Sequence, residues 1–122
     1  MKRLAIASAL LAASTIAQAE YKDVIAIEMT GECTFDELMV LVGSFNKIAE
    51  PRGYSAQIFM PGASNDMKTY YWVGTSPDTA TFGEAHDWWM GGVMSGEGQQ
   101  AELQSEFDEC TTQKSRQFFH AF

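Results

Sequence analysis

The order of strand-like and helix-like segments along this chain constrains its fold more than any other feature. Strands are predicted at 21–30 by a nearly continuous apolar run, at 54–60 and 116–122 by a period of two residues, and at 67–75 by aromatic and β-branched composition. A period of 3.6 residues predicts helices at 35–49, 77–90 and 99–109. The glycine-rich residues 91–98 break the second helical region in two. The order β-α-β-β-α-β predicts an α+β, ferredoxin-like domain in which helices cover one face of an antiparallel sheet.

Two helix starts are marked by their capping residues. Thr34 and Glu37 have the spacing of a capping box, in which the hydroxyl accepts from the N–H of Glu37 and the carboxylate reaches back. Ser76 and Pro77 predict the second start, with Ser76 as the N-cap and Pro77 as the first helical residue. We expect this second helix to end near Met90, before the glycines.

The first nineteen residues have the pattern of a secretory signal peptide. A basic start at 1–3 precedes an apolar run at 4–17, and Ala17-Gln18-Ala19 has the small-x-small pattern of a cleavage site. The run is shorter than the roughly 20 residues that span a bilayer, which disfavours the alternative of a membrane anchor. We therefore predict cleavage after Ala19, a periplasmic or secreted protein, and a single folded domain at 20–122.

The charge of the predicted mature chain limits its partners. Cleavage removes two of the eight basic residues, and the sixteen Asp and Glu then give a formal net charge of −10. Nucleic acid and anionic membrane surfaces would be repelled, so we predict that neither is a partner. High solubility of an exported domain is the simplest reason for this acidity.

The two cysteines, Cys33 and Cys110, predict one disulfide, because an even cysteine count in an exported chain favours pairing. Their wide spacing is unlike that of a redox pair or a zinc site. In the expected topology the two residues fall at the same end of the sheet. Closing so long a loop stabilises a domain by about 4 kcal/mol.

The element order, the length and the interrupted second helical region resemble the dimeric α/β-barrel superfamily, including antibiotic-biosynthesis-monooxygenase-like and NIPSNAP-like proteins. The resemblance implies a homodimer in which two sheets face each other. On the outer face of this sheet we expect either Tyr70 with Trp72 or Tyr71 with Val73. They are joined there by one row of the last strand, which holds either Phe118, His120 and Phe122 or Phe119 and Ala121.

The segment 82–94 is the best candidate for a functional site. On a helical wheel His86 and Trp89 share the apolar face with Phe82, whereas Trp88 points away. His86 is either a core histidine or a base in a pocket between the helix and the sheet. Trp88 is either the lip of a ligand site or packed under the following loop. We expect that His86 and Trp88 do not serve the same site unless the helix breaks before Met90.

Three functions remain open at this level. The first is binding of an apolar or aromatic small molecule, with ligand contacts from Tyr70, Trp72, Trp88, Trp89 and His120. The second is a cofactor-independent monooxygenase or isomerase that uses His86 as its base. The third is a non-catalytic structural dimer. His86 and His120 alone are too few ligands for a metal site, so we predict no metal and no cofactor.

Overall fold

The computed structural model describes residues 19–122, and the predicted signal peptide therefore lies almost wholly outside the described residues. The described chain forms four strands, three α-helices and a short 3-10 helix. These are β1 (Glu20–Met29), α2 (Phe35–Ala49), η1 (Glu50–Arg52), β2 (Ser55–Phe59), β3 (Thr69–Ser76), α3 (Thr79–Ser95), α4 (Gln99–Cys110) and β4 (Thr111–Ala121).

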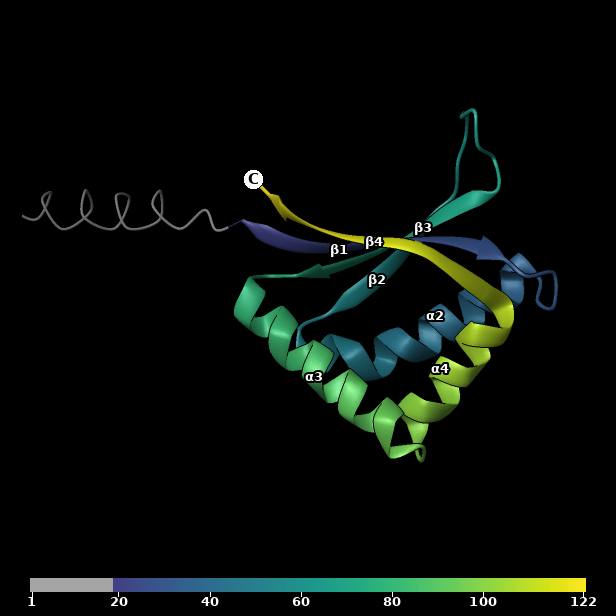
Figure 1. Cartoon of the computed structure of the whole chain (residues 1–122). Coiled ribbons are helices and arrows are strands. Elements are labelled where there is room, and N and C mark those ends of the chain that lie inside the picture. Colours follow the sequence, from purple (N-terminus) through teal and green to yellow (C-terminus); the bar gives the residue numbers. More distant parts are fainter. Residues whose placement is uncertain (1–18) are drawn as a thin grey trace, which may run out of the picture.

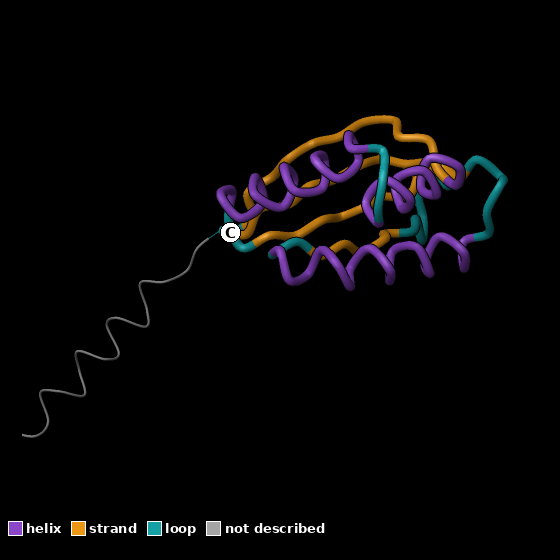
Figure 2. Tube along the Cα trace, turned by 90° about the horizontal axis from the view of Figure 1, so that it is seen from below, coloured by secondary structure: helices purple, strands orange, loops and turns teal. Residues whose placement is uncertain are grey.

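The strands form one antiparallel sheet in the order β2-β3-β1-β4, with β1 between β3 and β4. The three helices lie on one face of this sheet (Figures 1 and 2). The α+β class is thereby confirmed. No helix within residues 19–122 is long and apolar enough to cross a membrane.

Strand pairing decides which side chains face the helices. Ile25 of β1 lies opposite Trp72 of β3 and opposite Arg116 of β4, and directly opposed residues share a face of the sheet. The row with Tyr70, Trp72, Phe118 and His120 therefore faces the helices. The row with Tyr71, Val73, Phe119 and Ala121 forms the outer face.

One irregularity interrupts the pairing of β1 with β4. Ala26 pairs with Ser115 and Ile27 pairs with Gln113, so that Lys114 has no partner in the register. An extra residue of this kind is a β-bulge, and it bends the strand that carries it.

The boundaries of α3 differ from the prediction at both ends. Ser76 is the last residue of β3, and the N-cap is Asp78, whose carboxylate accepts from the N–H of Thr81 at 2.8 Å. The helix also runs past Met90 to Ser95. Gly92 lies inside the helix and does not end it. A Cβ at this position would overlap Gln100 of α4, so the glycine allows the two helices to pack closely.

The other cap and the cysteine pair are as predicted. The Thr34 hydroxyl accepts from the N–H of Glu37 at 3.2 Å, and α2 begins there. Cys33 and Cys110 form a disulfide with their Cα atoms 5.0 Å apart. The bond joins the turn after β1 to the end of α4, where the N–H of Thr30 also donates to the carbonyl of Cys110 at 3.0 Å.

Candidate functional site

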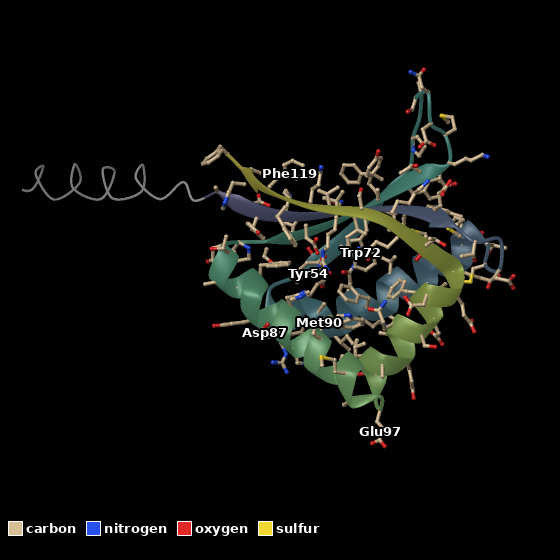
Figure 3. The ribbon with its side chains drawn as sticks, in the orientation of Figure 1. Tyr54, Trp72, Asp87, Met90, Glu97 and Phe119 are labelled. Carbon is tan, nitrogen blue, oxygen red and sulfur yellow. A yellow bond between two sulfur atoms is a disulfide. The ribbon has the colours of Figure 1, made fainter. Side chains whose placement is uncertain are left out.

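The helices and the sheet border a partly open cavity of about 390 Å³. Its wall includes residues of β1, β3, β4 and all three helices, together with Tyr54 just before β2. Tyr54 and Trp72 lie between the sheet and the helices, whereas Phe119 lies on the opposite side of the sheet (Figure 3). The cavity thus lies on the helix side of the sheet and is partly open to the surroundings.

Much of the wall is aromatic, with the rings packed edge to face. Phe45 of α2 lies 4.9 Å between ring centroids from both Trp72 and Trp89, and Phe107 of α4 lies 5.4 Å from Trp72. Edge-to-face pairs of this kind hold large side chains in defined positions. The wall therefore offers flat apolar surfaces whose positions are fixed by neighbouring rings.

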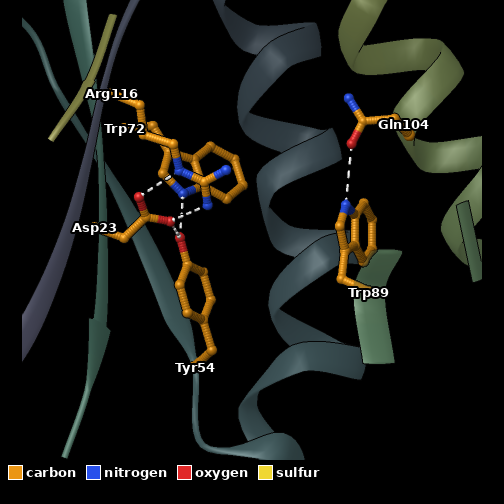
Figure 4. A network of polar contacts seen from close by, with 6 residues as sticks. All are labelled: Asp23, Tyr54, Trp72, Trp89, Gln104 and Arg116. Carbon is orange, nitrogen blue, oxygen red and sulfur yellow. Dashed lines mark hydrogen bonds and ion pairs between the residues drawn. The ribbon is translucent and has the colours of Figure 1, made fainter. Parts of the chain in front are cut away.

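A buried polar network forms another part of the wall (Figure 4). Arg116 donates from Nε and Nη2 to the two carboxylate oxygens of Asp23, each at 2.8 Å. The hydroxyl of Tyr54 donates to Asp23 Oδ2 at 2.8 Å and accepts from the indole N–H of Trp72 at 2.7 Å. Asp23 is only 1% exposed. A charge at such depth requires a partner, and Arg116 provides it in two-pronged geometry.

Burial raises the pKa of the Tyr54 hydroxyl far above its ordinary value, and the neighbouring Asp23 carboxylate raises it further. Hydrogen bonding to Asp23 also raises the pKa of Arg116. Tyr54 is therefore a neutral hydrogen-bond donor at physiological pH. Its role in the network is to position Asp23 and Trp72, since a phenol with so high a pKa does not release its proton under these conditions.

Gly74 makes room for this network on the sheet. It pairs with Asp23 across the β1–β3 ladder, and a Cβ at this position would overlap the ring and hydroxyl of Tyr54. Only a residue without a side chain lets the phenol cross β3 and reach the carboxylate of Asp23.

Replacing Gly74 by alanine is expected to lower the free energy of unfolding by roughly 3 kcal/mol, because Tyr54 must leave its hydrogen bonds. The matched control is Gly43→Ala in α2, where a Cβ meets no atom within 4 Å. That change is expected to stabilise the helix by about 0.5–1 kcal/mol. Urea denaturation measures both, and a stabilising effect of Gly74→Ala would contradict the assigned role.

A second polar chain links α3 to α4 at the cavity. The indole N–H of Trp89 donates to Gln104 Oε1 at 3.0 Å, and Gln104 Nε2 donates to Asp108 Oδ1 at 3.0 Å. Trp89 and Gln104 both belong to the cavity wall. The hydrogen bond restricts rotation of the Trp89 ring at the cavity wall.

His86 and Trp88 both line the cavity, which corrects the expectation that they serve different sites. The Arg52 guanidinium lies over the Trp88 ring, 4.8 Å from its centroid. The His86 ring stacks on Phe82 at 5.6 Å. Its imidazole makes no hydrogen bond to another side chain within residues 19–122, so no described carboxylate orients it as a base.

Two predicted ligand residues lie outside the cavity wall. Tyr70 packs edge-on against Phe35 of α2, with 5.7 Å between ring centroids. His120 lies near the end of β4, exposed, with its ring 5.3 Å from that of Tyr21. The structure brings together His86, Trp72, Trp88 and Trp89, and it separates His120 and Tyr70 from them.

The sequence interpretation missed the polar network, although one signal for it was present. Asp23 stands in the same alternating row of β1 as Ile25 and Ile27, and a carboxylate in a buried row indicates a paired charge. Its partner Arg116 is 93 positions away. No local pattern connects the two.

Within residues 19–122 no group of three or more His, Cys, Asp and Glu side chains is placed to hold a metal ion. Comparison of the chain with protein-family models, with curated proteins and with solved structures finds no significant match.

Proposed function

We propose that this protein binds an apolar or aromatic small molecule in the cavity between the sheet and the helices. The observation that carries the proposal is the cavity itself, with a volume of about 390 Å³. Small-molecule sites are typically apolar enclosures of about 300–1,000 Å³ with a few fixed polar groups. The tryptophan-rich wall and the network around Asp23 have this composition.

The chain contains three tryptophans, and Trp72, Trp88 and Trp89 all line the cavity. Each has one indole N–H signal in a ¹H–¹⁵N spectrum, so the three signals are local reporters of binding. Titration with 2-ethylnaphthalene is expected to shift them. Signals that stay unchanged at the solubility limit of the probe would contradict binding in this cavity.

Filling the cavity is expected to weaken this binding at least tenfold. Ala85 is buried and belongs to the wall, and Ala85→Phe places a ring in the cavity. Val93→Phe is a second filling variant at a less buried position of the wall. The matched control is Ala80→Phe, at an exposed position of the same helix, and it is expected to leave the affinity unchanged.

We also propose that the domain is ferredoxin-like and forms a homodimer through its outer sheet face. The strand order β2-β3-β1-β4 with antiparallel pairing supports the first statement. For the second, Phe59, Tyr71 and Phe119 of three different strands are 53%, 43% and 48% exposed on this face. Exposed aromatic surface of this kind is typical of interfaces.

The signal peptide is part of the same proposal, with the mature chain starting at Glu20. The disulfide supports it, because such bonds persist in oxidising compartments. Native mass spectrometry of protein from the periplasm is expected to give a dimer of chains that begin at Glu20. Tyr71→Glu is expected to give monomers, whereas Val40→Glu on exposed α2 surface retains the dimer. A monomeric wild type would refute the dimer proposal.

A further inference from the structure

We infer that the ligand of this cavity carries an oxygen acceptor, an aromatic carbonyl or carboxylate, which binds the free edge of the Arg116 guanidinium. The inference rests on the proposed function, since it names the chemistry of the molecule that the cavity binds. It follows from the hydrogen bonds that the wall has already made and from those that it still offers.

The guanidinium of Arg116 has N–H groups that no residue within 19–122 accepts from. Nε and one N–H of Nη2 are used by Asp23, whereas Nη1 donates to no residue within 19–122. A guanidinium has five N–H groups, so three are left for another acceptor. Arg116 belongs to the cavity wall and its side chain is 30% exposed, so part of the side chain is accessible.

The other polar groups of the network have their principal partners. Asp23 accepts from both Arg116 nitrogens and from Tyr54. The Tyr54 hydroxyl uses its only proton on Asp23 and accepts from Trp72. Among these four residues, Arg116 therefore holds the free donors, and the network presents donors to a ligand.

Two of the three indole N–H groups of the wall are also engaged, since Trp89 donates to Gln104 and Trp72 to Tyr54. These rings offer a ligand their faces rather than their donors. An aromatic body suits the ring faces and an oxygen acceptor suits Arg116. A cationic amine group at the same place would meet the guanidinium charge, so amines are disfavoured.

Three naphthalenes with a common ring system test this chemistry in the wild-type protein. 2-Acetylnaphthalene has a neutral carbonyl, 2-ethylnaphthalene has the same shape without the oxygen, and 2-naphthoate has a charged carboxylate. A hydrogen bond to a charged group is worth roughly a tenfold or larger change in affinity. We expect 2-acetylnaphthalene to bind about tenfold more tightly than 2-ethylnaphthalene, followed through the three indole signals.

The comparison of 2-naphthoate with 2-acetylnaphthalene tests whether the natural ligand is charged. Tighter binding of 2-naphthoate than of 2-acetylnaphthalene indicates a carboxylate ligand, and the reverse order indicates a neutral carbonyl. Either order supports the inference, provided that both compounds bind more tightly than 2-ethylnaphthalene.

Two variants locate the acceptor. Asp23→Asn with Arg116→Gln removes the charge pair together, and Arg116→Lys keeps the charge but removes the planar fork. Both are expected to reduce the preference for the carbonyl from about tenfold to less than threefold. Circular dichroism and the dispersion of the indole signals verify that each variant is folded, and either variant alone suffices for the comparison.

The possible failures are distinguishable. Equal binding of the ethyl and acetyl compounds to the wild type overturns the inference and leaves the proposed function standing. An unchanged carbonyl preference in the folded variants also overturns it, because the acceptor is then held elsewhere. If none of the three probes binds, the proposed function fails and the inference fails with it.

Discussion

Replacing Arg116 by methionine is expected to lower the free energy of unfolding by about 3–5 kcal/mol, because the Asp23 carboxylate then remains buried without its ionic partner. Asp23 is 1% exposed, and Arg116 supplies two of its three hydrogen bonds. Methionine keeps much of the length and the apolar stem of arginine. The loss of unfolding free energy therefore measures the cost of the unpaired carboxylate rather than the loss of side-chain packing.

The matched control is Lys114→Met on the same strand. Lys114 pairs with Glu28 at 2.8 Å, but these side chains are 47% and 32% exposed. Breaking so exposed an ion pair is expected to cost far less than the loss at Arg116, because solvent screens both charges. Adding Asp23→Asn to Arg116→Met is expected to recover part of the loss, since burying a neutral amide costs less free energy than burying a carboxylate. Urea denaturation measures all three, and equal losses for the two single variants would refute the argument.

Removing the disulfide is expected to have an effect of similar size. The bond between Cys33 and Cys110 spans 77 positions, and a loop of that length is worth about 4 kcal/mol in the chain-entropy treatment. For a domain of this size the corresponding fall in Tm is roughly 15–30 °C. Thermal unfolding of the double alanine variant measures the change.

A reductant provides the control for this second prediction. It is expected to lower the Tm of the wild type to that of the double alanine variant and to leave the variant itself unchanged. A difference below about 1 kcal/mol between the oxidised and reduced wild type would show that the cross-link constrains the unfolded chain very little.

The strand and helix segments were predictable because their signals lie within short stretches of chain, and the disulfide was predictable because two cysteines allow a single pairing. A strand or a helix is indicated by its own period, and the Thr34 cap by residues three positions apart. The errors at α3 have a different origin. Ser76 pairs with β1 in the sheet, and Gly92 packs against Gln100, so tertiary contacts override the local preferences of these residues for a cap and a break.

The candidate site was predictable only in part, for the same reason. The aromatic side chains at 88 and 89 stand out in any reading of the sequence, and they do line the cavity. Arg116 does not stand out, because its role depends on pairing with Asp23, which is distant in the chain. The place of Tyr54 depends on the missing side chain of Gly74, and that relation exists only once β1 and β3 are paired.

Lys114, the residue without a partner in the β1–β4 register, determines which face of the sheet the later residues of β4 occupy. Gln113 and Arg116 both face the helices although an odd step separates them, and regular alternation would place them on opposite faces. The bulge absorbs the extra residue and restores the phase of everything that follows it. The same sequence paired without the bulge would turn Arg116 toward the outer face and Phe119 toward the helices. The polarity of the cavity thus depends on the bulge as much as on the composition of the strand.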